Sequence, residues 1–174
     1  LMQGQAHPSA TTGDALPPTP KDDHGRHVSW VVLLSSPHLH YTFAGDEKPT
    51  RIPVDEAFIT KQVALYAKMQ GESFTAPVIH GHDEQANPER QGDVLRLEAW
   101  TDPNDGKLKL LGAVAWSDED APDKIKRGKL KYLSGGWGTI RDEDGREIPG
   151  VLRHLGVVSL PHQLNIDGGR GRHI

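Results

Sequence analysis

The chain has 174 residues, a formal net charge of −4 and no cysteine. Its length suits one ordinary domain with a single core. The slightly acidic balance excludes a global basic field, so we expect no electrostatic capture of nucleic acid or of an anionic membrane. Without cysteine, disulfides, thiolate nucleophiles and thiolate-ligated zinc are also excluded. No apolar run approaches the roughly 20 residues that cross a bilayer, and we expect a soluble protein made without export.

Residues 1–26 combine Gln, Gly, Ser, Thr, Pro and charges with almost no apolar periodicity. This composition predicts a flexible N-terminal arm. We expect one folded domain over residues 27–166 and a flexible C-terminal tail over residues 167–174. The domain opens with a β-branched run over residues 28–34, which predicts a strand buried on both faces.

A helix is predicted between Pro53 and Gln70. Apolar side chains in this stretch fall on one helical stripe, Pro53 suits the first turn, and Gly71 follows the last residue. A second helix is expected over residues 120–127, with Gly128 positioned to end it.

The other segments favour short strands. Residues 102–106 carry Asp, Pro, Asn and Gly, which predicts a hairpin turn. Six or seven short strands, mainly antiparallel, with two or three helices predict an α+β fold, a closed β-barrel flanked by helices. The expected strands cover residues 76–80, 92–100, 107–116, 129–133, 137–141 and 151–160.

Ser134 is expected at a strand end, where Gly135 and Gly136 follow it. Glycines after a nucleophilic serine let the backbone turn and bring N–H groups close to a substrate carbonyl, where they stabilise an oxyanion. The same pattern is typical of a bulge or turn in a β-hairpin, with Ser134 only capping the turn. The segment alone does not decide between these interpretations.

His80 and His82 lie two residues apart at the end of an expected strand, so we expect both side chains on one face. With Asp83 they offer ligands that suit zinc or iron, and His38 and His40 form another such pair. A solvated polar strand end explains the same residues.

His154 lies within the apolar run of the last expected strand. A histidine there is either a hydrogen-bonded core residue or the orienting partner of a catalytic imidazole. One serine and two histidines can together supply a nucleophile, a base and an orienting group.

Four short segments occur in order along the chain: His82-Asp83, Gly92-Asp93-Val94, Tyr132-Leu133-Ser134 with its glycines, and Val157-Val158-Ser159-Leu160-Pro161. Their order and spacing resemble the prohead (capsid maturation) proteases of tailed bacteriophages, which are similar to the herpesvirus assemblin serine proteases in fold and active-site plan. The resemblance covers residues 28–165 and implies a herpesvirus-protease-like barrel.

The resemblance implies a serine endopeptidase of phage capsid maturation that needs no cofactor or metal. It makes Ser134 the nucleophile, His82 the imidazole that activates it, and His154 the third member of the triad, a position that is acidic in many phage enzymes. The implied substrates are the phage scaffold, the arms of the major capsid protein and the enzyme's own ends, cleaved through an acyl-enzyme. The implied location is the prohead interior in the host bacterial cytoplasm, and self-association is left open.

The chain departs from the herpesvirus pattern after His154, where an arginine-containing loop helps to form the oxyanion hole in that family. Residues 161–165 hold no arginine, so the backbone N–H groups of Gly135 or Gly136 are the expected donors. Ser117 is a competing nucleophile in an acidic turn.

Other interpretations stay open. Ser159 is a further competing nucleophile, in a strand without adjacent glycines. The chain could instead be a non-catalytic capsid or scaffold component that retains the protease fold. It could also be a metal-dependent hydrolase that uses His80, His82 and Asp83.

Overall fold

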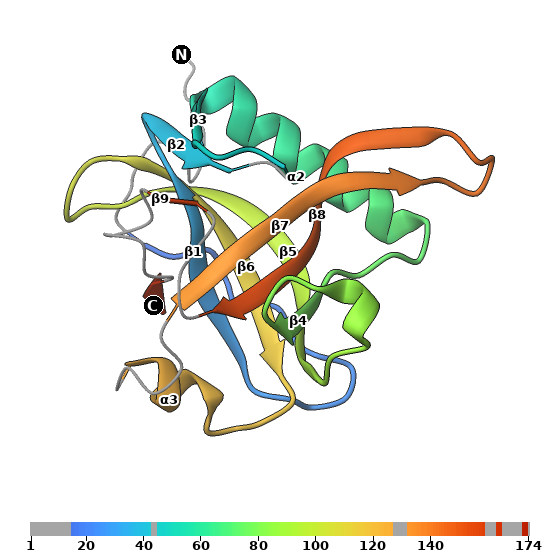
Figure 1. Cartoon of the computed structure of the whole chain (residues 1–174). Coiled ribbons are helices and arrows are strands. Elements are labelled where there is room, and N and C mark those ends of the chain that lie inside the picture. Colours follow the sequence, from blue (N-terminus) through green and yellow to red (C-terminus); the bar gives the residue numbers. More distant parts are fainter. Residues whose placement is uncertain (1–14, 43–44, 127–131, 159–162, 165–171, 174) are drawn as a thin grey trace, which may run out of the picture.

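The structure, a computed structural model, describes residues 15–42, 45–126, 132–158, 163–164 and 172–173 (Figure 1). These residues form an α+β fold, as predicted, whose only described helix of more than two turns is α2. The elements in chain order are β1 (Val28–Ser35), β2 (His38–Tyr41), β3 (Thr50–Pro53), α2 (Glu56–Gly71), β4 (Pro77–His80), a 3₁₀ helix (Glu84–Ala86), β5 (Arg90–Thr101), β6 (Leu108–Trp116), α3 (Ala121–Lys126), β7 (Tyr132–Arg141), β8 (Glu147–Val158), β9 (Gln163–Leu164) and β10 (Arg172–His173).

The larger sheet is mixed and mostly antiparallel. Its order is β10-β1-β6-β5-β4-β8-β7, and β3-β2-β9 form a smaller sheet. The pair β4–β8 is parallel, whereas the other neighbours in the larger sheet run antiparallel. Among the described strands, no ladder joins β7 to β10 or β1, so the predicted closed barrel is not confirmed.

Several predicted elements are confirmed. The strand expected over residues 28–34 is β1, and β5 and β6 form the hairpin across residues 102–106. The helix expected from Pro53 is α2, but it begins only at Glu56. The helix begins there because Asp55 is its N-cap residue. The Asp55 carboxylate accepts a hydrogen bond from the Phe58 N–H (2.8 Å).

The segment around Ser134 differs from the prediction. The two strands expected on either side of Ser134 form one strand, β7, which pairs with β8 through Ser134, Gly135 and Gly136. None of these three residues has a positive φ, so no left-handed turn interrupts the strand. Ser134 therefore lies inside a strand and not at its end. The strands β2 and β3 were not predicted, and Gly128 lies outside the described residues.

The helix α2 packs on the main core and is tied to two strands through Tyr66. The Tyr66 hydroxyl donates to the Val94 carbonyl in β5 (2.5 Å) and accepts from the Ala76 N–H just before β4 (2.9 Å). Burial raises the pKa of Tyr66 well above its ordinary value, so the hydroxyl stays protonated and can donate. The Tyr66 side chain thus links α2 to β5 and to the residue just before β4.

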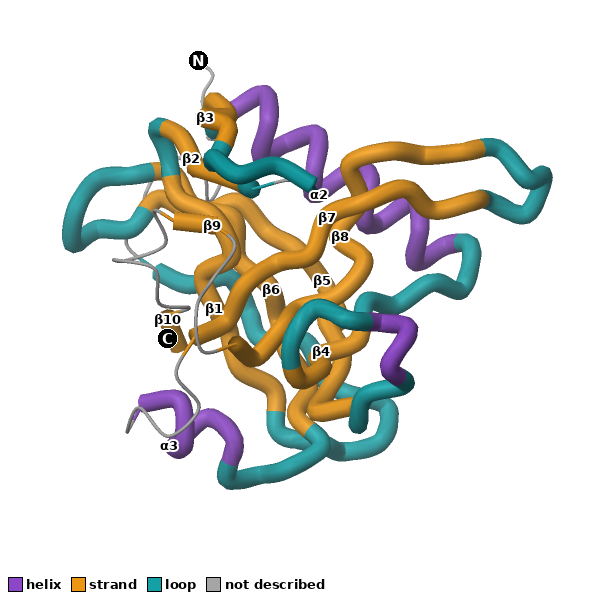
Figure 2. The backbone as a smooth tube through the Cα atoms, in the orientation of Figure 1, coloured by secondary structure: helices purple, strands orange, loops and turns teal. Residues whose placement is uncertain are grey.

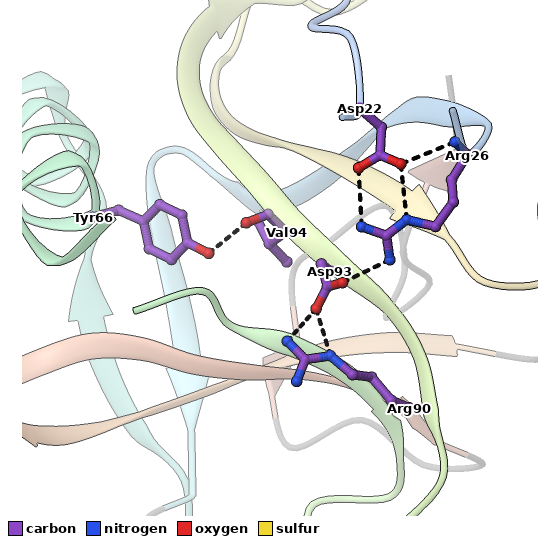
Figure 3. Close-up of polar contacts among 6 residues, drawn as sticks. All are labelled: Asp22, Arg26, Tyr66, Arg90, Asp93 and Val94. Atoms are coloured by element: carbon purple, nitrogen blue, oxygen red, sulfur yellow. Dashed lines mark hydrogen bonds and ion pairs between the residues drawn. The ribbon is translucent and has the colours of Figure 1, made fainter. Parts of the chain in front are cut away.

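Residues 15–26 lie against the other face of the sheet, although we predicted a flexible arm there. Leu16 packs against a second apolar cluster that includes Trp30, and the Trp30 indole donates to the Pro17 carbonyl (3.1 Å). Figure 3 shows the second attachment, in which the Arg26 guanidinium bridges two carboxylates. Its Nε lies 2.9 Å from Asp22 Oδ2, and its Nη1 lies 2.7 Å from Asp93 Oδ2 in β5. Residues 1–14 of the predicted arm lie outside the described residues.

Candidate active site

The parallel pairing of β4 with β8 brings His82 to β8. His80 stands opposite Val157, and the following Gly81 N–H donates to the Val157 carbonyl (2.9 Å). Gly81 has a φ of +72°, which glycine adopts without strain, and it turns the chain into the loop and 3₁₀ helix that follow β4 in Figure 2. His80 is therefore exposed while His82 is half-buried. The expectation that both histidines share a face is wrong.

Four positions of β7 and β8 form a cluster on one face. Ser134 stands directly opposite Gly156, and Gly136 stands opposite His154. Positions two apart in a strand point to the same side, and opposed residues have Cβ atoms only about 4.5–5.5 Å apart. Intervening positions such as Leu155 belong to the main core. The cluster thus lies on the face turned away from that core.

Two glycines of this cluster leave room for two imidazole rings. A Cβ on Gly136 would collide with the His154 ring, which lies across it. A Cβ on Gly156 would lie 2.9 Å from His82 Cε1 and 3.1 Å from His82 Nδ1. The His82 ring therefore occupies the space of the absent side chain directly opposite Ser134.

The two rings begin a chain of polar contacts that ends at a carboxylate. His82 Nδ1 lies 2.7 Å from His154 Nε2, within hydrogen-bond distance, and His154 Nδ1 lies 3.6 Å from Glu84 Oε1, slightly beyond that distance. Arg153 holds the other carboxylate oxygen of Glu84, with its Nε 3.1 Å away. Glu84 is not among the predicted site residues. The one signal for it is its place two residues after His82 in a polar segment.

Ser134 is fully buried, and its Oγ has no hydrogen-bond partner among the described residues. A hydrogen bond from Ser134 to His82 is therefore not formed in this structure, although the cross-strand geometry places the two side chains next to each other. Catalytic hydrogen bonds are often long in unliganded enzymes and tighten when substrate binds.

The backbone of Gly135 and Gly136 lies at a sheet edge. Successive residues of an antiparallel strand direct their N–H groups alternately toward the partner strand and away from it. One of these two N–H groups therefore points to β8 and the other to the outer side of β7, which is the last strand of the described sheet.

The other candidate nucleophiles and metal ligands do not join this cluster among the described residues. Asp83 is exposed, and its carboxylate accepts from the Gln85 N–H (3.0 Å) at the start of the 3₁₀ helix. Within the described ranges, no three His, Asp or Glu side chains are grouped so as to hold a metal ion. Ser117 is exposed at the end of β6, and Ser159 lies outside the described residues. His38 and His40 pack edge-to-face on β2, with ring centroids 5.1 Å apart.

A pocket of about 440 Å³ opens over the two imidazoles. The polar residues of its lining are Thr42, Asp46, His82, Glu84, Arg153 and His154. Tyr41 and Trp137 form an aromatic wall on another side. Ser134 does not line the pocket, because it lies beneath this surface.

Comparison with known proteins finds no matching family model, no similar curated protein and no similar solved structure. None of the described helices is long and apolar enough to cross a membrane.

Proposed function

We propose that this protein is a serine endopeptidase in which Ser134 is the nucleophile, His82 the general base and His154 the residue that orients His82. The contact of 2.7 Å between the two imidazoles carries the proposal, because it occurs over the glycine that stands opposite a buried serine. An imidazole activates a serine best when a third group fixes its tautomer and orientation.

The contacts favour one arrangement of protons. A proton on His154 Nδ1 faces the Glu84 carboxylate and leaves His154 Nε2 as an acceptor. His82 then donates from Nδ1 to His154 Nε2, which leaves its own Nε2 as the base for the Ser134 proton. Glu84 thus supplies, through one intervening ring, the negative charge that an acidic triad member supplies directly.

In this mechanism Ser134 Oγ attacks the carbonyl carbon of the scissile peptide bond while its proton passes to His82. The protonated imidazole then donates to the leaving amine, and water hydrolyses the acyl-enzyme by the reverse transfers. The outward N–H group of Gly135 or Gly136 is the proposed oxyanion donor. Substrate binding must expose Ser134, which is buried in the present form.

The proposed substrates are phage scaffold and the arms of the major capsid protein within the prohead, and the enzyme's own ends. This proposal follows from the resemblance of the four short segments to the prohead proteases, and the α+β architecture with a mostly antiparallel sheet is compatible with it. The finer proposal, a herpesvirus-protease-like barrel, is supported by contacts between β7, the last strand of that sheet, and β1, the second strand from its other end.

A fluorescent serine-directed phosphonate tests the assignment. We expect the phosphonate to label Ser134 in the wild-type chain, and Ser134→Ala to abolish both labelling and cleavage of scaffold. Glu84→Gln should slow labelling by about 10- to 100-fold, because it removes the charge behind His154. The matched control is Ser117→Ala, which removes an exposed hydroxyl that neither lines the pocket over the two imidazoles nor belongs to the proposed triad. Scaffold cleavage that persists in Ser134→Ala would refute the proposal.

The alternative, a non-catalytic capsid or scaffold component with the same fold, is favoured by the complete burial of Ser134 and by the lack of a hydrogen-bond partner for its Oγ among the described residues. It predicts no labelling of Ser134 and no cleavage, even with scaffold at high concentration. The same experiment therefore separates the two functions.

A further inference from the structure

A second pocket adjoins the one over the imidazoles. It has a volume of about 160 Å³ and shares Tyr41 and Trp137 with the first. A ligand that contacts His82 and His154 along the first pocket can therefore extend past this aromatic wall into the second without leaving the surface.

The second pocket is apolar. Leu39 of β2, Ile52 of β3 and Phe58 of α2 line it beside the shared wall. Besides the polar atoms of Tyr41 and Trp137, the described lining includes the amide of Gln62, which is buried on α2. Among the described residues, no charged side chain lines it. A charged group would lose hydration there without gaining an oppositely charged partner among these residues, so the pocket favours apolar groups.

The size of the pocket narrows the occupant further. A dry apolar cavity of about 150 Å³ accommodates benzene. The 160 Å³ here thus has room for a side chain of the size of leucine or phenylalanine, and alanine would leave most of it empty.

We propose that this pocket is a specificity site for a leucine- or phenylalanine-sized apolar side chain of the peptide substrate, at a position near the scissile bond. The inference rests on the proposed function, since it takes the imidazole pocket as the place where the peptide is cleaved. It names a substrate class, peptides with a bulky apolar residue at one fixed position, which the catalytic residues alone do not determine.

The first arm of the test measures cleavage. The wild-type chain is given a library of internally quenched octapeptides in which each position in turn holds Leu, Phe, Ala or Asp. We expect one position at which Leu or Phe raises kcat/KM by about tenfold or more over Ala, with Asp lower still. Ile52→Phe should fill the pocket and reduce this preference to less than about threefold. Phe58→Ala should enlarge the pocket and favour Phe over Leu.

Arg51→Phe is the matched control. It places the same ring on the neighbouring residue of β3, which is exposed and points to the opposite side of the strand. The preference for Leu over Ala should be unchanged in this variant. Cleavage without any apolar preference, or with a preference that Ile52→Phe leaves intact, would overturn the specificity site while the proposed function stands.

The second arm measures binding without chemistry. The same library is passed over immobilised full-length Ser134→Ala protein, and the bound peptides are identified by mass spectrometry. Enrichment of Leu and Phe at one position, lost on adding Ile52→Phe, supports the specificity site even if the wild-type chain cleaves nothing and the proposed function fails. Absence of such enrichment together with absence of cleavage overturns both.

Discussion

At the scale of single residues, the candidate site depends on glycines that leave space for rings. The His154 ring lies across Gly136, the Trp137 ring lies against Gly135, and the His82 ring fills the space over Gly156. Glycine in a strand interior costs stability, because it packs nothing and orders a flexible backbone. Here each glycine allows a neighbouring side chain to reach a position that a Cβ would block.

Gly156→Ala tests this role. Its Cβ would lie 2.5 Å from the Gly81 carbonyl oxygen and 2.9 Å from His82 Cε1, so the loop after β4 and the His82 ring must move. We expect a loss of about 1–3 kcal/mol in the free energy of unfolding. We also expect phosphonate labelling of Ser134 to be lost in the protein that remains folded.

Gly92→Ala is the matched control, because its Cβ would collide with the Ala115 carbonyl in the β5–β6 ladder, and β5 is separated from β8 by β4. It should destabilise the chain to a similar degree, as followed by urea unfolding, while folded molecules are labelled at the wild-type rate. Normal labelling in Gly156→Ala would show that the position of the His82 ring is not needed.

At the scale of elements, α2 holds β4 and β5 in the arrangement that brings the loop after β4 to β8. The link is the Tyr66 hydroxyl, which joins Val94 of β5 to Ala76 (Figure 3 draws its bond to Val94). Gln70, one turn further along α2, donates to the Leu95 carbonyl. The helix thus sets where β4 begins, and β4 sets where His82 lies.

Tyr66→Phe removes only the hydroxyl and leaves the buried Val94 carbonyl and Ala76 N–H without it. Unsatisfied buried polar groups cost about 1–3 kcal/mol, and we expect a loss of that size in the free energy of unfolding. Thr60→Ala, at an exposed position of the same helix, should change it by less than about 0.5 kcal/mol. Chemical denaturation followed by circular dichroism measures both, and equal stabilities would contradict the role of Tyr66.

At the scale of the whole molecule, the segment over residues 15–26 is attached to the sheet by charge as well as by apolar contact. The Arg26 guanidinium, hydrogen-bonded to the Asp22 carboxylate, holds the pKa of Asp22 well below its ordinary value. The same guanidinium reaches Asp93, which Arg90 also contacts (Figure 3). The strength with which this segment is attached to the sheet should therefore depend on pH.

The sign of this dependence follows from the lowered pKa. A carboxyl group whose pKa is lower in the folded state stabilises that state fully above its unfolded pKa, about 3.9 for Asp, and loses this effect as the pH falls further. We expect wild type to be more stable than Arg26→Ala at neutral pH, with a difference that shrinks below about pH 4. Urea unfolding over a pH series measures it, with Lys21→Ala as an exposed control. A difference that is independent of pH would contradict the attachment.

Much of the local structure could be predicted because periodicity, caps and turn residues act over a few neighbours. The strand β1, the body of α2 and the β5–β6 hairpin were predicted from such patterns. The strand break at Ser134 was predicted wrongly, because the glycine pattern is typical of a turn and only the ladder with β8 shows that it lies inside a strand.

The sequence by itself singled out Ser134, His82 and His154 as candidate site residues. A hydroxyl and two imidazoles can supply a nucleophile, a base and an orienting group. Only the tertiary structure decided how they meet. His82 and His154 are 72 residues apart in sequence, and they come within 2.7 Å because β4 pairs in parallel with β8. The contact of Glu84 with His154, the burial of Ser134 and the apolar pocket beyond Trp137 also arise between distant segments. Long-range pairing of this kind leaves no periodic signal in a single sequence.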